Sequence, residues 1–311
     1  MAAQTSREGV APSLQALDLL RTVPGLENMM AVHVESPYTI PSGHLSLEHL
    51  TELSNKVNEI AESNPEAGLV ITTGTDTLEE AAYFIDLTYC QANPVVFTGA
   101  MRDASQISPD GPRNIKDAAL TAACSECRDL GVMVVLNGEI HAARDVTKTH
   151  TTDVSSFRSP MLGPLGIVHG ERIVMRRKPS DREYIDTKRA AQRVELIKCV
   201  IGGDGRAMYA MMDLGVDGFV VEAFGGGHVP PGVRDAIAQA VKKDMPVVVT
   251  SRCHWGELLT NTYDYQGSEI DLRAVGALFV GCLNGPKARV KLSLCLGAGM
   301  TRNQLASYFP D

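Results

Sequence analysis

The segment from Gly68 to Glu80, GLVITTGTDTLEE, constrains the fold of this chain more than any other part of the sequence. Its apolar run Leu69–Thr72 leads through a polar turn straight into an amphipathic helical pattern. A buried strand followed at once by a helix is typical of α/β folds built on a parallel sheet. Because such sheets bind ligands at the carboxyl ends of their strands, the turn predicts a site that contains Thr75 and Asp76.

The alternation of apolar runs and amphipathic windows continues along the chain and predicts the α/β class throughout. Runs such as VVFT and VVVT are apolar at nearly every position, as expected for parallel strands whose two faces are both covered. Strands are expected at Ala31–Val34, Leu69–Thr72, Val95–Thr98, Val132–Leu136, Ile197–Ile201, Gly218–Glu222, Val247–Thr250 and Ala277–Val280. Helices are expected at Thr77–Thr88, after the cap residue Ser46, at Asn114–Cys127, from Pro230-Pro231 to Lys243, and from Pro286 to Leu296.

The length and composition suit two globular domains. The chain has 311 residues, of which 44% are hydrophobic and 21% are charged. The composition changes abruptly at 171–195, where the charged stretch RRKPSDREY occurs. We interpret 171–195 as a linker or β-hairpin arm between an N-terminal catalytic domain, 1–170, and a smaller C-terminal domain, 196–311.

A second polar loop, ARDVTKTHTTD at Ala143–Asp153, contains a single lysine, Lys148, between threonines. A threonine hydroxyl is a poor nucleophile until a base takes its proton. A lysine amine can act as that base, but its ordinary pKa of about 10.4 must first be lowered by burial. The loops therefore cooperate only if the fold brings Thr75 and Lys148 together, with Asp76 orienting the amine or binding an amino group of the substrate. The first backbone amides of the helix at 77–88 could then hold a developing oxyanion.

A purely structural interpretation of the first turn also fits its residues. Asp76 and Glu79 have the spacing of a capping box, in which polar side chains only start the helix. Thr77 and Glu80 have the same spacing. The turn alone does not favour one interpretation over the other.

Three longer segments match a known family in order and spacing. They are TGTDTLEEAAYFIDL, which begins at Thr73, NPVVFTGAMRDASQISPDGPRN at Asn93–Asn114, and ARDVTKTHTTDVSSFRSPMLGPLG at Ala143–Gly166. These segments resemble the bacterial-type L-asparaginase/glutaminase family. A looser similarity extends from about Val10 to the C-terminus.

The resemblance implies both an architecture and a reaction. It implies a larger flavodoxin-like, doubly wound sheet in the N-terminal domain and a smaller Rossmann-like parallel sheet in the C-terminal domain. The implied reaction converts the side-chain amide of L-asparagine, with L-glutamine as a second candidate substrate, into a carboxylate and ammonia through a threonine acyl-enzyme. Relatives need no cofactor and are homotetramers built from tight dimers, whose sites are completed by a partner's C-terminal domain. The resemblance therefore implies that this chain forms a homo-oligomer, either a dimer or a tetramer.

The resemblance also implies site residues. By match to the family's motifs, Thr75, Asp76 and Lys148 form the catalytic set. The implied substrate-binding positions are Ser42 and Gly43 in IPSGHLSLEHL, Gly74 in the turn, and Ala100 in the GAMR motif. Ser42 would hold the α-carboxylate of the substrate, and the backbone of Ala100 would contact the leaving amide.

The chain departs from the family at its N-terminus. Relatives begin with a strand that ends in a TGGTI-type motif, whose first threonine is held to be the primary nucleophile, whereas this chain opens MAAQTSREGVAPSLQALDLL. In a flavodoxin-like sheet the first strand lies inside the sheet, so its loss would leave two rows of backbone groups unpaired. We therefore expect the native protein to extend upstream. The alternative is a catalytically impaired or non-catalytic homologue that binds an amino-acid amide or a dicarboxylate.

Composition argues against several other classes. The formal charge of −8 and the lack of a basic stripe argue against a nucleic-acid partner, and with it against the ammonia-releasing subunit of a tRNA-dependent amidotransferase, which shares this fold. No apolar run reaches the length of a membrane span. His44 and His49 lack a third ligand at useful spacing, so no metal site is expected. Seven scattered cysteines, an odd number, favour reduced thiols and a cytoplasmic location.

Two further histidines have open interpretations. His150 either tunes the pKa of the nearby Lys148 or points to solvent. His228, in EAFGGGHVPP, either supports the site or is an ordinary loop residue. In that loop a glycine fills the place where many relatives carry an asparagine.

Overall fold

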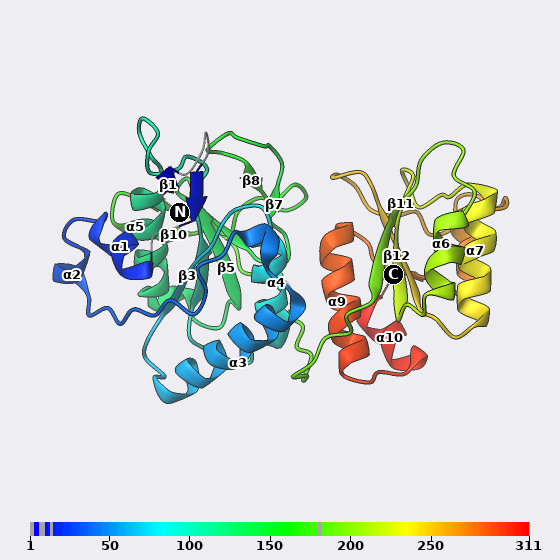
Figure 1. The fold of residues 1–311 in the computed structure, drawn as a ribbon, viewed down its shortest axis with the longest axis horizontal. Helices are drawn as coiled ribbons and strands as arrows, with labels where there is room; N and C mark the ends of the chain where they lie inside the picture. The colour runs from blue at the N-terminus through cyan, green and yellow to red at the C-terminus, as the bar shows by residue number, and fades with distance from the viewer. Residues whose placement is uncertain (1–2, 6–9, 13–14, 180–181, 311) are drawn as a thin grey trace. The chain divides into compact units, whose positions relative to one another are not determined.

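The computed structural model describes residues 3–5, 10–12, 15–179 and 182–310. The chain divides into two compact units, Met1–Tyr184 and Ile185–Asp311. Each unit is built on a β-sheet with helices packed against it (Figure 1). The predicted α/β class with two domains is confirmed.

The first unit is built on a mixed six-stranded sheet with the order β10-β9-β6-β5-β4-β3. Its strands are β3 (Leu69–Thr72), β4 (Val95–Thr98), β5 (Val132–Leu136), β6 (Glu139–Ala142), β9 (Gly166–His169) and β10 (Arg172–Met175). β3, β4 and β5 are parallel, as their apolar runs predict, whereas β6, β9 and β10 join antiparallel. The carboxyl ends of β3 and β4 therefore lie next to each other.

Two helices cover the parallel strands from opposite faces (Figure 1). α5 (Gly111–Ala122) packs on the face that carries Val96 and Met133. Phe97, which points to the other face, is also fully buried, and α4 (Leu78–Thr88) contacts the sheet there. The remaining elements of the unit are β1 (Ala3–Thr5), β2 (Val10–Pro12), α1 (Ala16–Arg21), α2 (Leu26–Met29), η1 (Ser42–His44), α3 (Leu47–Ser63), η2 (Ser125–Cys127), β7 (Thr147–Lys148) and β8 (Phe157–Arg158).

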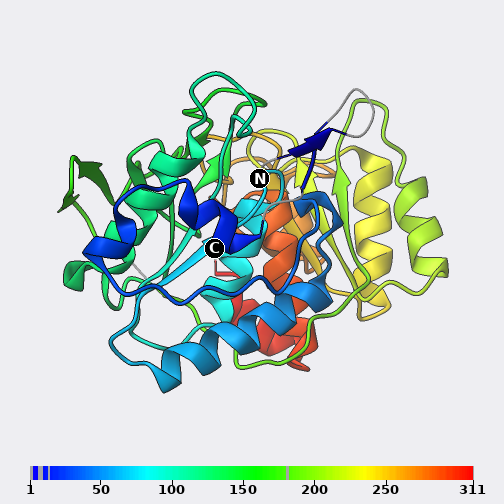
Figure 2. The ribbon, with the colours of Figure 1, turned by 60° about the vertical axis from the view of Figure 1, so that its left-hand side comes forward.

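The second unit is built on a parallel four-stranded sheet with the order β11-β12-β13-β14. Its strands are β11 (Val194–Lys198), β12 (Gly218–Ala223), β13 (Val247–Ser251) and β14 (Leu278–Phe279). Its helices are α6 (Arg206–Asp213), α7 (Pro231–Lys242), α8 (Glu269–Ala274), α9 (Gly285–Gly297) and α10 (Arg302–Tyr308). α6 and α7 lie side by side on one face of this sheet (Figure 2), while α9 contacts the sheet from the other face.

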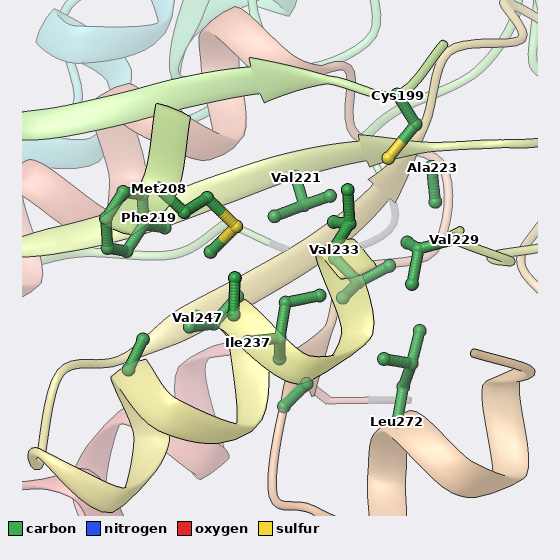
Figure 3. Packing of buried hydrophobic residues seen from close by; sticks show 14 of the residues in the cluster. Cys199, Met208, Phe219, Val221, Ala223, Val229, Val233, Ile237, Val247 and Leu272 are labelled. Carbon is green, nitrogen blue, oxygen red and sulfur yellow. The ribbon is translucent and has the colours of Figure 1, made fainter. Parts of the chain in front are cut away.

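The core of the second unit fills the space beneath α6 and α7. Met208 of α6 and Val233 and Ile237 of α7 pack against Phe219 and Val221 of β12 (Figure 3). Four of these side chains are completely buried and Val233 is 4% exposed. This core explains why β12 is apolar at nearly every position, as expected for a central parallel strand.

The prediction of a strand at Ala31–Val34 is wrong. These residues form no strand, and Val32 is 41% exposed. β3 is the last strand of its sheet, and among the described residues no strand pairs with its outer side. An apolar run without a neighbouring strand has no partners for its backbone groups, so it remains irregular and solvated.

Two other predicted elements are shifted or split. The strand predicted at Ile197–Ile201 is β11, which ends at Lys198, and Ile201 is 97% exposed. The helix predicted at Asn114–Cys127 is divided into α5 and the 3-10 turn η2. Apolar residues thus continue past the end of β11 onto the surface, where residue type alone does not mark the boundary.

Candidate active site

The turn that carries Thr75 continues the backbone ladder of the central sheet. The N–H of Thr73 donates to the carbonyl of Thr98 across 3.0 Å, so the ends of β3 and β4 are joined beyond the strands themselves. Gly74 is buried and Thr75 is partly buried. A Cβ atom at Gly99, directly after β4, would lie 2.6 Å from the Thr73 carbonyl oxygen and 3.2 Å from Thr75 Cγ2. The position behind Thr75 therefore accepts only glycine.

Lys148 lies in a separate two-stranded ribbon. β7 and β8 pair antiparallel, with Lys148 opposite Phe157 and Thr147 opposite Arg158. The N–H of Thr149 donates to the carbonyl of Ser156 across 2.8 Å, which extends the ribbon past Lys148. Because the backbone on both sides of Lys148 is paired, its side chain leaves the ribbon in one defined direction.

The two loops meet at the lysine amine. Lys148 Nζ lies 2.9 Å from Thr75 Oγ1 and 2.8 Å from Asp76 Oδ1. The side chain of Lys148 is 16% exposed and that of Asp76 is 78% exposed. The fold thus brings a hydroxyl, an amine and a carboxylate into contact from segments more than seventy residues apart in sequence.

The capping-box interpretation of the same turn does not describe this geometry. Thr77 is the N-cap of α4, yet its side chain makes no capping hydrogen bond. Its hydroxyl instead donates to the carbonyl of Ser42 across 2.9 Å. The Asp76 carboxylate accepts from Lys148. Both polar side chains therefore face away from the helix start and toward other loops.

The predicted substrate-binding residues surround this turn. Ser42 begins the 3-10 turn η1, is 3% exposed and is tied to the turn through Thr77. Gly43 beside it is exposed. Ala100 directly follows Gly99 and is partly buried.

Two residues that sequence reasoning missed hold the loop after β4. The carboxylate of Asp110 accepts from the N–H groups of Met101 at 3.1 Å and Arg102 at 2.9 Å. Asn114 is 1% exposed and donates to the carbonyl of Gly99 across 2.9 Å. The available signal was the PDGPRN motif, because Asp and Asn side chains commonly bind nearby backbone groups in turns.

His150 and His49 form hydrogen bonds with backbone groups close to them in sequence. His150 Nδ1 accepts from the backbone N–H groups of Thr152 and Asp153 at 3.1 and 3.0 Å, so its ring shapes the loop after Lys148. His49 Nδ1 lies 3.2 Å from the N–H of Ser46 and completes a capping box at the start of α3. Within the described ranges, no group of three or more His, Cys, Asp or Glu side chains has the arrangement of a metal site.

His228, in the second unit, has an acidic partner. Its Nε2 lies 3.1 Å from the carboxylate of Glu269, which is completely buried. Burial raises the pKa of Glu269, but the backbone N–H groups of Tyr263 and Thr262 donate to it and outweigh that effect, so the pKa lies below its ordinary value. The loop histidine is therefore anchored to an ionised side chain.

In the part of the chain that the structure describes, no helix is both long and apolar enough to cross a membrane. No disulfide forms there either, although all seven cysteines are among the described residues.

Comparisons with known proteins identify the family. The family models "Asparaginase, N-terminal" and "Glutaminase/Asparaginase C-terminal domain" match residues 1–181 and 193–309. An L-asparaginase of Bacillus licheniformis is 36% identical over 267 residues, which cover 86% of this chain and 83% of that protein. L-asparaginase 2 of Escherichia coli K12 is 35% identical over 298 residues, covering 94% and 83%. A glutaminase-asparaginase of Pseudomonas fluorescens biotype A is 30% identical over 297 residues, covering 94% and 80%. The chain therefore belongs to the asparaginase/glutaminase family and is an asparaginase-type amidohydrolase.

Proposed function

We propose that this chain hydrolyses the side-chain amide of L-asparagine to aspartate and ammonia, with Thr75, Asp76 and Lys148 as the reacting set. The observation that carries the proposal is that Lys148 Nζ lies within hydrogen-bonding distance of both the Thr75 hydroxyl and the Asp76 carboxylate. The relatives that are named L-asparaginases support the choice of substrate.

The proposed reaction has two halves. In the first, the neutral amine of Lys148 takes the proton of Thr75, and Thr75 Oγ1 attacks the amide carbon. The carbon–nitrogen bond breaks, and the nitrogen leaves as ammonia with the proton that Lys148 returns. In the second half, water attacks the resulting ester with Lys148 again as the base, and Thr75 recovers its proton. The backbone amides at the N-terminus of α4 would stabilise the oxyanion in both halves.

The positions of the neighbouring residues suggest how the substrate binds. Asp76 is 78% exposed, so its second carboxylate oxygen is available for the α-ammonium group. Ser42, tied to Thr77, would hold the α-carboxylate. Ala100, beside Gly99 at the end of β4, would accept a hydrogen bond from the leaving amide through its carbonyl.

A lysine substitution tests the proposal directly. Lys148→Met removes the base but keeps the length of the side chain, and general-base catalysis typically contributes about 10²- to 10⁴-fold, so we expect ammonia release from asparagine to fall by that factor. Lys116→Met is the matched control, because Lys116 also forms a 2.8 Å ion pair, with Glu171, away from the site. Unchanged turnover in Lys148→Met would refute the proposed role of the amine.

The same assay decides between hydrolysis and binding alone. A non-catalytic homologue would bind aspartate in calorimetry but release no ammonia from asparagine or glutamine. Glutamine is longer than asparagine by one methylene, which is worth only about 1–3 kcal/mol in a pocket, so kcat/KM must be measured for both amides. The glutaminase-asparaginase relative makes glutamine a reasonable second substrate.

We also propose that the protein forms a homo-oligomer. Several apolar and aromatic side chains that follow β11 and β13 are exposed, at the carboxyl end of the second sheet; they are Val200, Ile201, Trp255, Tyr263 and Tyr265. The rings of Tyr263 and Tyr265 lie with their centroids 6.1 Å apart, and contiguous exposed apolar surface is typical of interaction sites. Sedimentation equilibrium tests the proposal, and a monomer at working concentration would contradict it.

A further inference from the structure

A polar cluster with two buried members links β6 to the ribbon that carries Lys148. It consists of Glu139, His141, Arg158 and Ser159, and we call it the His141 cluster. His141 Nδ1 lies 3.0 Å from Ser159 Oγ, and Nε2 lies 3.3 Å from Glu139 Oε2, although outside hydrogen-bonding alignment. Arg158 Nη1 donates to both carboxylate oxygens of Glu139, at 3.1 and 3.0 Å.

The cluster connects two pieces of the structure that lie in different sheets. Glu139 and His141 are two residues apart on β6, so their side chains point to the same face of the central sheet. Arg158 is the last residue of β8, and Ser159 follows it. In the described residues, β7 and β8 form a two-stranded sheet of their own, apart from the six-stranded one.

The chain attaches the Lys148 ribbon to the sheet at its two ends in different ways. Before β7, the N–H groups of Asp145 and Val146 donate to the carbonyl of Ala142, at the end of β6, in a tight turn. After β8, the His141 cluster makes the contact back to β6 through side chains. The N–H of Leu165 then donates to the carbonyl of Ile140 across 2.7 Å, so the cluster is a side-chain attachment that lies nearer to Lys148 along the chain than the backbone pairing of β6 with β9.

The contact between His141 and Ser159 is buried, so breaking it costs free energy. His141 is completely buried and Ser159 is 6% exposed, so the ring and the hydroxyl serve each other as partners. The hydrogen bond joins His141 Nδ1 to the Ser159 hydroxyl, and the tautomer of the ring decides which of the two atoms donates. Removing the ring would leave that hydroxyl buried without a partner, and the ribbon would have to move to solvate it.

We propose that His141 is a positioning residue for the amide hydrolysis: through Ser159 and the Glu139–Arg158 pair it fixes the ribbon so that Lys148 Nζ reaches Thr75. The inference rests on the proposed role of Lys148. Thr75 and Asp76 lie on other elements, so His141 acts on the base and leaves substrate binding alone. A shift of about 1 Å in a reacting group can cost on the order of 10²-fold in rate, which is ample for an effect transmitted through the ribbon.

A double-mutant cycle with Lys148 tests the proposal. His141→Leu fills the space without polar atoms, and we expect kcat to fall about 10²-fold, as for a misplaced base, with KM for asparagine close to the wild-type value. In a Lys148→Met background, the same substitution should cause no further fall, because the group that it positions is absent. An equal fall in both backgrounds, or a rise in KM with unchanged kcat, would overturn the proposal.

Two conservative variants and one control complete the test. His141→Asn keeps an acceptor near the place of Nδ1 and should recover part of the lost kcat, whereas Ser159→Ala should lower kcat even if His141→Leu does not fold. Ser54→Ala removes another buried hydroxyl, which lies 2.7 Å from Thr88 Oγ1 at the carboxyl end of α4, and should change stability but not kcat. Wild-type kcat in both His141→Leu and Ser159→Ala would also overturn the inference. Turnover that survives Lys148→Met would instead refute the proposed function, so the two failures are distinguishable.

Discussion

The two halves of the candidate site are held in place by different means. The turn with Thr75 extends the backbone ladder between β3 and β4, and Gly99 packs directly against it. The ribbon with Lys148 is joined to the central sheet by backbone hydrogen bonds on either side of it and, closer to β8, by the side chains of the His141 cluster. One half of the site is thus defined chiefly by backbone sterics, whereas the other also depends on polar side chains.

The difference predicts which substitutions each half tolerates. Close backbone packing leaves no space for a larger side chain, because an added methyl group meets main-chain atoms that cannot rotate away. A polar cluster fails in another way, since deleting one partner leaves the other buried and unpaired. The turn should therefore be sensitive to added volume, and the ribbon should be sensitive to lost hydrogen bonds.

Among the substitutions that compare how the two halves are held, the largest effect is expected from adding volume behind Thr75. In Gly99→Ala the new Cβ would lie 2.6 Å from the carbonyl oxygen of Thr73, so the turn must move. We expect kcat to fall about 10²-fold, as for a misplaced nucleophile, and the unfolding free energy to drop about 1–3 kcal/mol. Kinetic assays and urea unfolding measure the two quantities. Gly281→Ala, where nothing lies within 4 Å of the added atom, is the matched control. A wild-type kcat in Gly99→Ala would contradict the conclusion that close packing against Gly99 holds the Thr75 turn in place.

A smaller effect is expected from Asn114, which shows how far the turn also depends on a side chain. Asn114 donates to the Gly99 carbonyl and accepts from the N–H of Asn137 across 3.0 Å. Asn114→Ala removes two partly buried hydrogen bonds, each worth about 0.5–1.5 kcal/mol, so we expect a loss of about 1–3 kcal/mol in stability. We expect kcat to fall less than in Gly99→Ala, because the backbone ladder remains.

A second buried asparagine provides the control for that prediction. Asn93 donates to the carbonyls of Asn64 and Ala67 at 2.8 and 2.7 Å, away from the site. Asn93→Ala should therefore lose similar stability without any change in kcat/KM. If Asn114→Ala reduced kcat as much as Gly99→Ala, the turn would depend on side chains as strongly as the ribbon does.

The sequence predicts the turn better than the ribbon, for a physical reason. The turn's strand, loop and helix are contiguous in 69–88, so residue pattern alone predicts them and the ligand-binding end of the sheet. His141 and Ser159 are separated by eighteen residues, and neither belongs to a recognisable turn or cap. A contact of that kind depends on the register of β6 and on the course of the ribbon, which local pattern does not encode.

The same limit explains the one predicted strand that does not form. The apolar residues at 31–34 have the composition of a strand, but pairing also needs a neighbouring edge. Composition also extends β11 wrongly to Ile201, because an exposed isoleucine is indistinguishable in sequence from a buried one. Element type is thus predictable from local residues, whereas pairing and exact ends are set by distant parts of the chain.

The smallest expected effect concerns the charge within the His141 cluster. The contact with His141, more than the charge of Arg158, holds the pKa of Glu139 below its ordinary value against the opposing effect of burial. A carboxyl with a depressed pKa stabilises the folded state fully above its ordinary pKa of about 4.3, and this contribution is lost as the pH falls through the folded-state pKa. Glu139→Gln should therefore lower the urea midpoint at neutral pH and converge with the wild type in acid.

The control for this last prediction is a carboxylate whose pKa is also lowered, but at the surface. Glu171 pairs with Lys116 and is 63% exposed, so solvent screening leaves little of that interaction, and Glu171→Gln should follow the wild type at every pH. If the Glu139→Gln and wild-type curves also coincided from neutral pH into acid, the cluster's charge would contribute nothing to folding. Within the cluster, the His141–Ser159 contact would then be the one that holds the Lys148 ribbon.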